Sequence, residues 1–321
     1  MLLKINDLHT YFKSPKGIIK AVNGVSFQIG EGKTVAVVGE SGCGKSVTAS
    51  TLMGILDKKT SIIDGEILFE GKDLLKLSPE EMRKIRGKDI SMIFQEPMTS
   101  LNPALKIGYQ VSEVFRTHFD MDKKTAKAKS IEMLKRVKLP RAEKIYNSYP
   151  HELSGGQCQR VMIAMALSSE PKLLIADEPT TALDVTIQAR VLELMRELKE
   201  EFNTSIMFIT HDFGVVAEMA DEVVVMYAGR AVEKGRTEEI FTNPLHPYTK
   251  ALLKARPKLG EVEENLYNIE GSVPNPIDLK DSCYFADRCK ECMEICRRKN
   301  PVEINKDGHY VSCFLYGGRD E

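Results

Sequence analysis

The chain contains 321 residues, and its 45 lysines and arginines nearly balance its 46 aspartates and glutamates. This length gives room for two modest domains, and the formal charge of −1 argues against bulk electrostatic attraction to nucleic acid or anionic lipid. With 42% hydrophobic and 28% charged residues the chain has the content for a packed core, while no apolar run approaches the roughly 18 residues that cross a bilayer. The N-terminus lacks the basic start and long apolar stretch of a secretory signal, so we expect a cytoplasmic protein.

Short apolar runs alternate with helical patterns along the chain, which predicts an α/β fold with buried parallel strands. The strands are expected at 34–38, 89–93, 173–176, 205–209 and 222–226. Helices are expected at 157–168 and at 187–202, where apolar residues recur on one face. From about 97 the strand pattern disappears, which indicates a helical subdomain of about 97–168 inserted in the α/β core. Prolines become frequent after 241, so we place a boundary between a domain over 1–240 and an extension over 241–321.

Residues 39–46 match the pattern G-x-x-x-x-G-K-[ST] and lie between a predicted strand and a predicted helix. In such a phosphate loop the backbone N–H groups and the helix N-terminus face phosphate oxygens. Lys45 is expected to neutralise the β and γ phosphates of a nucleotide, and the Ser46 hydroxyl to bind Mg²⁺. A glycine-rich turn without a ligand is the competing interpretation. The candidate ATP-binding residues here are Gly39, Glu40, Ser41, Gly42, Cys43, Gly44, Lys45, Ser46 and Val47.

The predicted strand at 173–176 is followed by two acids, Asp177 and Glu178. Asp177 is expected to hold the magnesium ion, and Glu178 is placed to polarise an attacking water molecule. An acid pair after a strand is often only structural. Downstream of a phosphate loop, however, it is a catalytic candidate.

A third motif, Leu-Ser-Gly-Gly-Gln at 153–157, introduces a predicted helix. A serine followed by two glycines at a helix N-terminus can bind an anion or can simply cap the helix. The local pattern does not separate these interpretations.

Together these motifs resemble the ATP-binding cassette (ABC) family over about 1–240, because they occur in that family's order with Gln95, Asp184 and His211 at matching places. The resemblance implies a P-loop NTPase fold: a RecA-like parallel-sheet core, an N-terminal antiparallel β part and the helical insertion. It also implies that Gln95 contacts magnesium and the attacking water, that Asp184 lies in the D-loop, and that His211 touches the γ-phosphate.

The same resemblance places an aromatic side chain on the adenine of ATP, with Phe12 the better match and Tyr11 the alternative. It further implies a head-to-tail dimer, in which one subunit's signature residues close over the nucleotide held by the other. Those residues are Ser154, Gly155, Gly156 and Gln157. Nucleotide binding then closes the dimer and hydrolysis reopens it.

Residues 95–103, 149–152 and 246–249 resemble the ATPase subunits of dipeptide and oligopeptide permeases, as does the tail. Nickel importers share these features and remain an alternative, and a soluble ABC ATPase acting on the ribosome or on DNA is a more distant one. The permease resemblance implies a second ATPase subunit in a heterodimer or homodimer, two transmembrane permease subunits and an external substrate-binding protein. It implies location at the cytoplasmic face of the membrane and no nucleic-acid partner.

Five of the seven cysteines fall within the last 39 residues. An odd count in a cytosolic chain argues against a disulfide framework and favours thiolate ligation. The permease resemblance selects Cys283, Cys289, Cys296 and Cys313, which suit a [4Fe-4S] cluster or, alternatively, a Zn²⁺ site. Free thiols without a metal are the third alternative. Cys292 is left over, and the sequence thus predicts a small cysteine-rich C-terminal domain whose metal holds it together.

Overall fold

The structure, a computed structural model, describes residues 1–181, 183–255 and 268–317. The chain forms two compact units. The first consists of 1–2, 29–34 and 76–209, and the second of 3–28, 35–75 and the part that follows 209. No helix among the described residues is both long and apolar enough to cross a membrane.

The first unit contains three parallel strands, β6 (Ile90–Ile93), β7 (Leu173–Asp177) and β8 (Ser205–Thr210). In their register Ile90 pairs with Leu173, which in turn pairs with Ser205. Every residue of β7 and β8 is buried, which explains why these strands read as continuous apolar runs rather than alternating ones. The three strands predicted from the sequence are confirmed to within one residue at each end.

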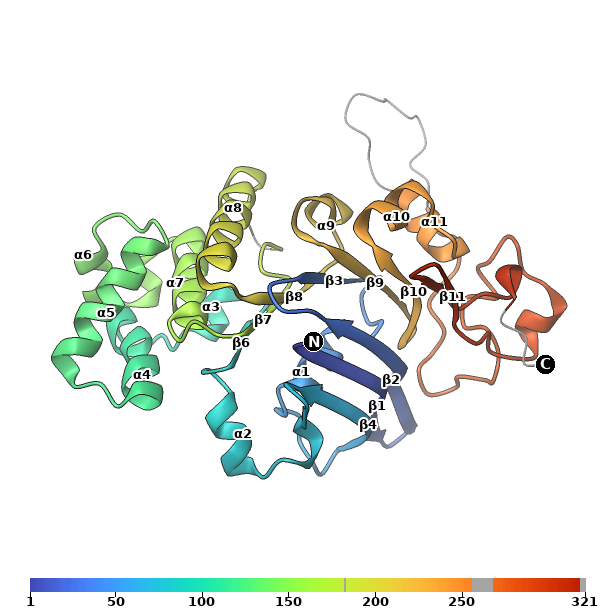
Figure 1. Ribbon diagram of the computed structural model, residues 1–321, viewed down its shortest axis with the longest axis horizontal. Coiled ribbons are helices and arrows are strands. Elements are labelled where there is room, and N and C mark those ends of the chain that lie inside the picture. The colour runs from blue at the N-terminus through green and yellow to red at the C-terminus, as the bar shows by residue number, and fades with distance from the viewer. Residues whose placement is uncertain (182, 256–267, 318–321) are drawn as a thin grey trace. The chain divides into compact units, whose positions relative to one another are not determined.

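Helices make up the rest of this unit, and most of them come after β6 and before β7 in the chain (Figure 1). They are α2 (Pro79–Ile85), α3 (Pro97–Ser100), α4 (Ile107–Phe119), α5 (Lys123–Arg136), α6 (Ala142–Asn147), η2 (Pro150–Glu152), α7 (Gly155–Leu167) and α8 (Val185–Phe202). Helices α4, α5 and α6 pack together, and the buried Ser112 hydroxyl of α4 contacts the hydroxyls of Ser130 and Tyr146 at 2.9 and 3.0 Å. Helices therefore occupy the stretch in which the strand pattern of the sequence disappears, and the subdomain bounds of about 97–168 stay a prediction.

In the second unit the N-terminal part forms an antiparallel sheet in the order β2-β1-β4-β5 (Figure 1). Its strands are β1 (Leu3–Ser14), β2 (Gly17–Ile29), β4 (Ser61–Phe69) and β5 (Lys72–Asp73). A register shift interrupts β1 between Asn6 and His9, where Asp7 adopts a φ of 44°. This sheet is the antiparallel part that the family resemblance implied.

A second sheet of this unit runs in the order β3-β9-β10-β12-β11, and only its β3–β9 pair is parallel. Its strands are β3 (Thr34–Val38), β9 (Glu222–Tyr227), β10 (Arg230–Arg236), β11 (Ile304–Lys306) and β12 (His309–Val311). The predicted strands at 34–38 and 222–226 are thereby confirmed. The accompanying helices are α1 (Lys45–Leu52), α9 (Phe213–Met219), α10 (Thr237–Thr242) and α11 (Pro247–Lys254), with short 3₁₀ turns η1 (Leu74–Lys76), η3 (Glu294–Arg297) and η4 (Phe314–Tyr316).

The C-terminal extension shares its core with the strands of this sheet. Phe285 is buried in the same apolar cluster as Val38 of β3 and Tyr227 of β9, and Cys283 and Cys289 pack against that cluster. The extension also adds β11 and β12 to the edge of β10. A separately packed cysteine-rich domain is therefore not shown, because Phe285 of the extension is buried against the sheet, while Ala286, Cys296 and Phe314 form only a small cluster beside it.

Candidate nucleotide-binding site

The phosphate loop (residues 39–46) follows β3 and leads directly into α1, as the motif requires. Gly39 and Gly44 have φ values of 151° and 101°, which side-chain-bearing residues rarely adopt. A Cβ at Gly39 would lie 2.2 Å from the carbonyl oxygen of Met226, and one at Gly44 would lie 2.4 Å from that of Ala21. Both glycines are therefore required by the close approach of backbone to the loop.

Lys45 and Cys43 both turn their side chains into the loop. The Lys45 Nζ donates to the carbonyl oxygens of Gly39 and Glu40 at 2.8 and 3.0 Å, so the ammonium group lies across the inside of the loop. Cys43 is buried, its Sγ lies 3.8 Å from that Nζ, and burial raises the pKa of the thiol. Because Cys43 fills space beneath the loop as a neutral thiol, its packing explains its presence.

The two aromatic candidates for adenine stacking lie on opposite faces of β1. The Thr10 hydroxyl is 2.9 Å from that of Thr51 in α1, so even-numbered residues at this end of the strand face the helix that follows the phosphate loop. Tyr11 points the other way, where its hydroxyl donates to Asn23 Oδ1 at 2.6 Å. This alternation places Phe12 on the face of β1 that carries α1.

Gln95 and Glu178, both predicted from the sequence, are brought together in the first unit. Gln95 Nε2 donates to Glu178 Oε2 at 3.1 Å, and the Thr181 hydroxyl donates to the same oxygen at 2.8 Å. The backbone of Glu178 has a φ of 46° and its N–H donates to the Ile209 carbonyl, so the turn after β7 is fixed to β8. Asp177 is buried at the end of β7. Sequence analysis missed Thr181, whose only signal was its place three residues after the acid.

The signature residues begin α7 as a capping box. The Ser154 hydroxyl accepts from the Gln157 N–H at 3.4 Å, while Gln157 Oε1 accepts from the Ser154 N–H at 3.0 Å. Ser154 and Gly155 are exposed, and a Cβ on Gly155 would meet nothing within 4 Å. Capping alone accounts for the local conformation, and the exposed glycine leaves the helix terminus open to a partner molecule.

Two further residues predicted from the sequence, Asp184 and His211, lie outside the strands and just before the helices α8 and α9. Asp184 caps α8 by accepting from the Ile187 N–H at 3.0 Å, which explains why this helix begins two residues earlier than the apolar pattern predicts. His211 is a residue of the second unit and comes directly after the last residue of β8 and immediately before the residue that caps α9. Ala182, two residues before Asp184, lies outside the described residues.

The four predicted ligand cysteines lie near one another in the extension. The Cys283 N–H donates to the Cys296 carbonyl at 2.8 Å, and Cys296 Sγ accepts from the Met293 N–H at 3.4 Å. Burial raises the pKa of the Cys283 thiol to about 12 and that of Cys289 to about 11, with smaller contributions from neighbouring thiols. Among the residues that the structure describes, no three His, Cys, Asp or Glu side chains are arranged to hold a metal ion. The structure therefore does not support the predicted [4Fe-4S] or Zn²⁺ site.

Comparison with known proteins identifies the family. Residues 22–181 match the family described as "ABC transporter", and residues 232–296 match "Oligopeptide/dipeptide transporter, C-terminal region". The chain is 53% identical to the oligopeptide transport ATP-binding protein AppD of Bacillus subtilis (strain 168) over 98% of this chain and 97% of that protein. This chain belongs to the ABC transporter family.

Other ABC transporter proteins agree with that assignment along nearly the whole chain. The oligopeptide transport ATP-binding protein OppD of Salmonella typhimurium is 49% identical over 98% of this chain and 93% of its own length. The dipeptide transport ATP-binding protein DppD of Bacillus subtilis is 49% identical over 100% of this chain and 96% of its own length. Both relatives extend through the cysteine-bearing region as well as the cassette.

A solved ABC transporter cassette has the same fold. The dimeric structure of the ATP-binding cassette MJ0796, in a post-hydrolysis state bound to ADP and Pi, aligns with a TM-score of 0.66 and 28% identity. It covers 73% of this chain and 98% of that one. The P-loop ABC ATPase fold expected from the sequence is thereby confirmed.

Proposed function

We propose that this chain is the ATP-hydrolysing subunit of an ABC importer that takes up dipeptides or oligopeptides. The observation that carries the proposal is the 53% identity with AppD, an oligopeptide transport ATP-binding protein, over 98% of this chain. The match of 232–296 to an oligopeptide/dipeptide transporter region supports the same cargo class. The pairing of Gln95 with Glu178 supports ATP hydrolysis as the chemistry.

The proposed reaction is the attack of water on the γ-phosphorus of ATP. Glu178 takes the proton as the water oxygen bonds to phosphorus, and the bond from phosphorus to the β–γ bridging oxygen breaks to leave ADP and phosphate. Gln95 and Thr181 orient the Glu178 carboxylate by donating to one of its oxygens. His211 contacts the γ-phosphate in this scheme.

The nucleotide itself is held by the phosphate loop and by Val47, which together give the nine proposed contact residues 39–47, with Phe12 stacked on adenine. Lys45 then exchanges its bonds to loop carbonyls for bonds to the β and γ phosphates. The oxygen donors of Ser46, Gln95 and Asp177 suit Mg²⁺, which binds hard oxygen ligands and neutralises phosphate charge.

Turnover in this proposal needs two ATPase subunits, either two copies or a heterodimer. Ser154, Gly155, Gly156 and Gln157 of one subunit close over the γ-phosphate held by the other, and Asp184 lies in the D-loop of the same interface. The exposure of Ser154 and Gly155 supports this, as does the dimeric state of the MJ0796 cassette.

The transporter is completed by two membrane-spanning permease subunits and an external substrate-binding protein. We propose that 95–102 and the helical insertion dock on the permease subunits, which places the chain at the cytoplasmic face of the membrane. The proposed domains remain a cassette over 1–240 and an extension over 241–321.

The decisive experiment is uptake of labelled dipeptides and oligopeptides by cells that lack this subunit. Wild-type protein should restore uptake, and the Glu178→Gln variant, expressed to the same level, should not. Failure of the wild-type protein to restore either uptake would contradict the proposed cargo. Restoration by the variant would contradict the role of Glu178.

A metal centre at Cys283, Cys289, Cys296 and Cys313 is a separate proposal that rests on the cysteine pattern alone. Anaerobic purification followed by iron and zinc analysis and visible absorption tests it. Iron with cluster absorption supports the [4Fe-4S] prediction, whereas one zinc per chain replaces it with the alternative. Metal-free protein contradicts both.

A further inference from the structure

The C-terminal extension contacts the carboxylate of Glu40, a residue of the phosphate loop, through Arg288. Arg288 Nη1 and Nη2 donate to Glu40 Oε2 and Oε1 at 2.8 and 3.1 Å, which is the two-pronged pairing that a planar guanidinium makes best. Only 6% of the Arg288 side chain and 25% of the Glu40 side chain are exposed. The pair therefore differs from a solvated surface ion pair, and it joins residues 248 positions apart in the second unit.

Arg288 is itself fixed by further hydrogen bonds. Its Nε donates to the Glu270 carbonyl at 3.1 Å, its Nη2 to the Ile269 carbonyl at 3.2 Å, and its Nη1 to the Tyr227 hydroxyl at 3.3 Å. Burial opposes the charge of Arg288, but the hydrogen bonds to Glu40 and Tyr227 outweigh it and raise its pKa. Because all three nitrogens of the guanidinium donate hydrogen bonds, its orientation toward Glu40 is fixed.

The backbone of Glu40 is held by an aromatic cluster beneath the same loop. Its N–H donates to the Tyr248 hydroxyl at 2.9 Å. Tyr248 packs against Tyr227 and Phe285 with ring centroids 4.7 and 5.4 Å apart, and the Arg288 guanidinium lies 5.7 Å from the Tyr227 centroid. The loop is thus attached to α11 and to the cysteine-bearing segment at one residue.

Glu40 also contacts Lys45, the lysine that is expected to bind phosphate. Lys45 Nζ donates to the Glu40 carbonyl, so any shift of Glu40 changes the surroundings of the ammonium group. An unpaired carboxylate in the phosphate loop would also repel the triphosphate, since like charges disfavour each other more strongly where water is scarce. Arg288 neutralises and fixes the Glu40 side chain, while the Tyr248 hydroxyl holds the Glu40 backbone N–H.

We propose that Arg288 is a positioning residue for nucleotide binding, which fixes Glu40 and thereby keeps the phosphate loop in the conformation that accepts ATP. The cysteine-bearing segment 283–289 is then coupled to the nucleotide site, so that changes in that segment alter ATP affinity. The inference rests on the proposed function in one respect, namely that the loop binds ATP.

The test is ATP binding to the full chain with Mg²⁺, measured by isothermal titration calorimetry. Arg288→Gln should weaken ATP affinity by about 3- to 30-fold, in the range seen when a coupling residue outside the site is changed. The double variant Glu40→Gln/Arg288→Gln should recover part of that loss, because it removes the carboxylate left unpaired. A general loss of packing would instead make the double variant bind as weakly as the single one, or more weakly, and that result overturns the proposal.

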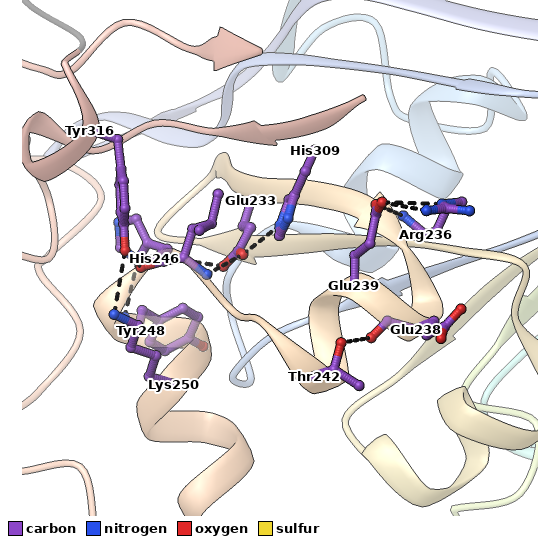
Figure 2. Close-up of polar contacts among 11 residues, drawn as sticks. Glu233, Arg236, Glu238, Glu239, Thr242, His246, Tyr248, Lys250, His309 and Tyr316 are labelled. Carbon is purple, nitrogen blue, oxygen red and sulfur yellow. Dashed lines mark hydrogen bonds and ion pairs between the residues drawn. The ribbon is translucent and has the colours of Figure 1, made fainter. Parts of the chain in front are cut away.

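The matched control is Arg236→Gln. Arg236 pairs with Glu239 through two guanidinium nitrogens, but 71% of its side chain is exposed and the pair lies on α10 and the residue before it (Figure 2). The ATP affinity of the Arg236→Gln variant should match that of the wild-type chain. If Arg288→Gln binds ATP as tightly as the wild-type chain, the inference about Arg288 is overturned but the proposed function is not. If the wild-type chain itself does not bind ATP, the proposed function is contradicted.

A second measurement uses the wild-type chain, so it does not depend on whether the Arg288→Gln variant folds. Because coupling between two sites is reciprocal, ATP should slow hydrogen–deuterium exchange in 283–289 of the wild-type chain. Arg288→Lys, which keeps the charge but offers one nitrogen, should show a smaller affinity loss than Arg288→Gln. Exchange in 283–289 that does not respond to ATP overturns the proposal.

Discussion

Glu233 of β10 and His309 of β12 form a buried contact in which His309 Nε2 lies 2.7 Å from Glu233 Oε1 (Figure 2). The same carboxylate accepts the Leu245 N–H at 2.6 Å and the His246 N–H at 2.9 Å. One side chain therefore fastens the final strand and the start of α11 to the sheet. This relationship fixes the extension that carries Arg288.

Glu233→Gln should destabilise the chain. The amide replaces one acceptor oxygen with an N–H₂ group that faces existing donors, and a buried donor without an acceptor costs about 1–3 kcal/mol. Unfolding in urea, followed by circular dichroism, measures the loss. Glu238→Gln, on the exposed side of α10, is the control and should stay within about 0.5 kcal/mol of the wild-type protein. Equal stability of the two variants would show that Glu233 is not a structural anchor.

The elements that sequence could predict are those whose pattern is local. The buried strands β7 and β8 are continuous apolar runs, and the phosphate loop is a fixed spacing of glycines and lysine. The helix α8 begins two residues before its predicted start, because its cap, Asp184, precedes the apolar pattern from which the start was predicted. Local signals of these kinds depend on few residues and on no distant contact.

The contacts between Glu40 and Arg288 could not be predicted in this way. They join residues 248 positions apart, and nothing in either local sequence identifies the other. The sequence also did not show which of Phe12 and Tyr11 faces α1, because the face of β1 that meets α1 is set by the Thr10–Thr51 contact. Distant pairing, rather than residue type, decides such positions.

Glu178→Gln should bind ATP normally and lose turnover. The amide oxygen can still accept from Gln95 and Thr181, but it cannot take the proton of the attacking water. General base catalysis contributes about 10²- to 10⁴-fold, so phosphate release by the assembled transporter should fall by at least about 100-fold. Glu193→Gln, an exposed position on α8, is the control. Normal hydrolysis by Glu178→Gln would falsify its assignment as the base.

Lys45→Ala should act one step earlier, on ATP binding itself. The variant loses the ammonium group that now bonds the Gly39 and Glu40 carbonyls and that is expected to bind phosphate. Hydrogen bonds to charged groups contribute about 1.5–3 kcal/mol, which corresponds to an affinity loss of about 10- to 150-fold. Lys58→Ala, at an exposed position, should bind like the wild-type chain. Unchanged affinity in Lys45→Ala would remove this residue from the site.

His246 should make the stability of the chain depend on pH. It is buried at the start of α11, where its Nδ1 accepts from the Tyr248 N–H at 3.0 Å, and burial, with help from Lys250, lowers its pKa from 6.5 to about 3. Between these values the unfolded chain binds a proton at His246 that the folded chain does not. The free energy of unfolding should therefore fall as the pH decreases from about 6.5 towards about 3, by at most about 1.4 kcal/mol per pH unit from this group.

The variant His246→Asn isolates that contribution, because asparagine can cap the helix but does not titrate. Urea unfolding of both proteins at a series of pH values should give a shallower decline for His246→Asn between pH 6 and pH 4. Many other groups titrate in this range, but their contributions cancel in the difference between the two proteins. Parallel curves for wild type and His246→Asn would mean that His246 is protonated in the folded chain much as it is in the unfolded one.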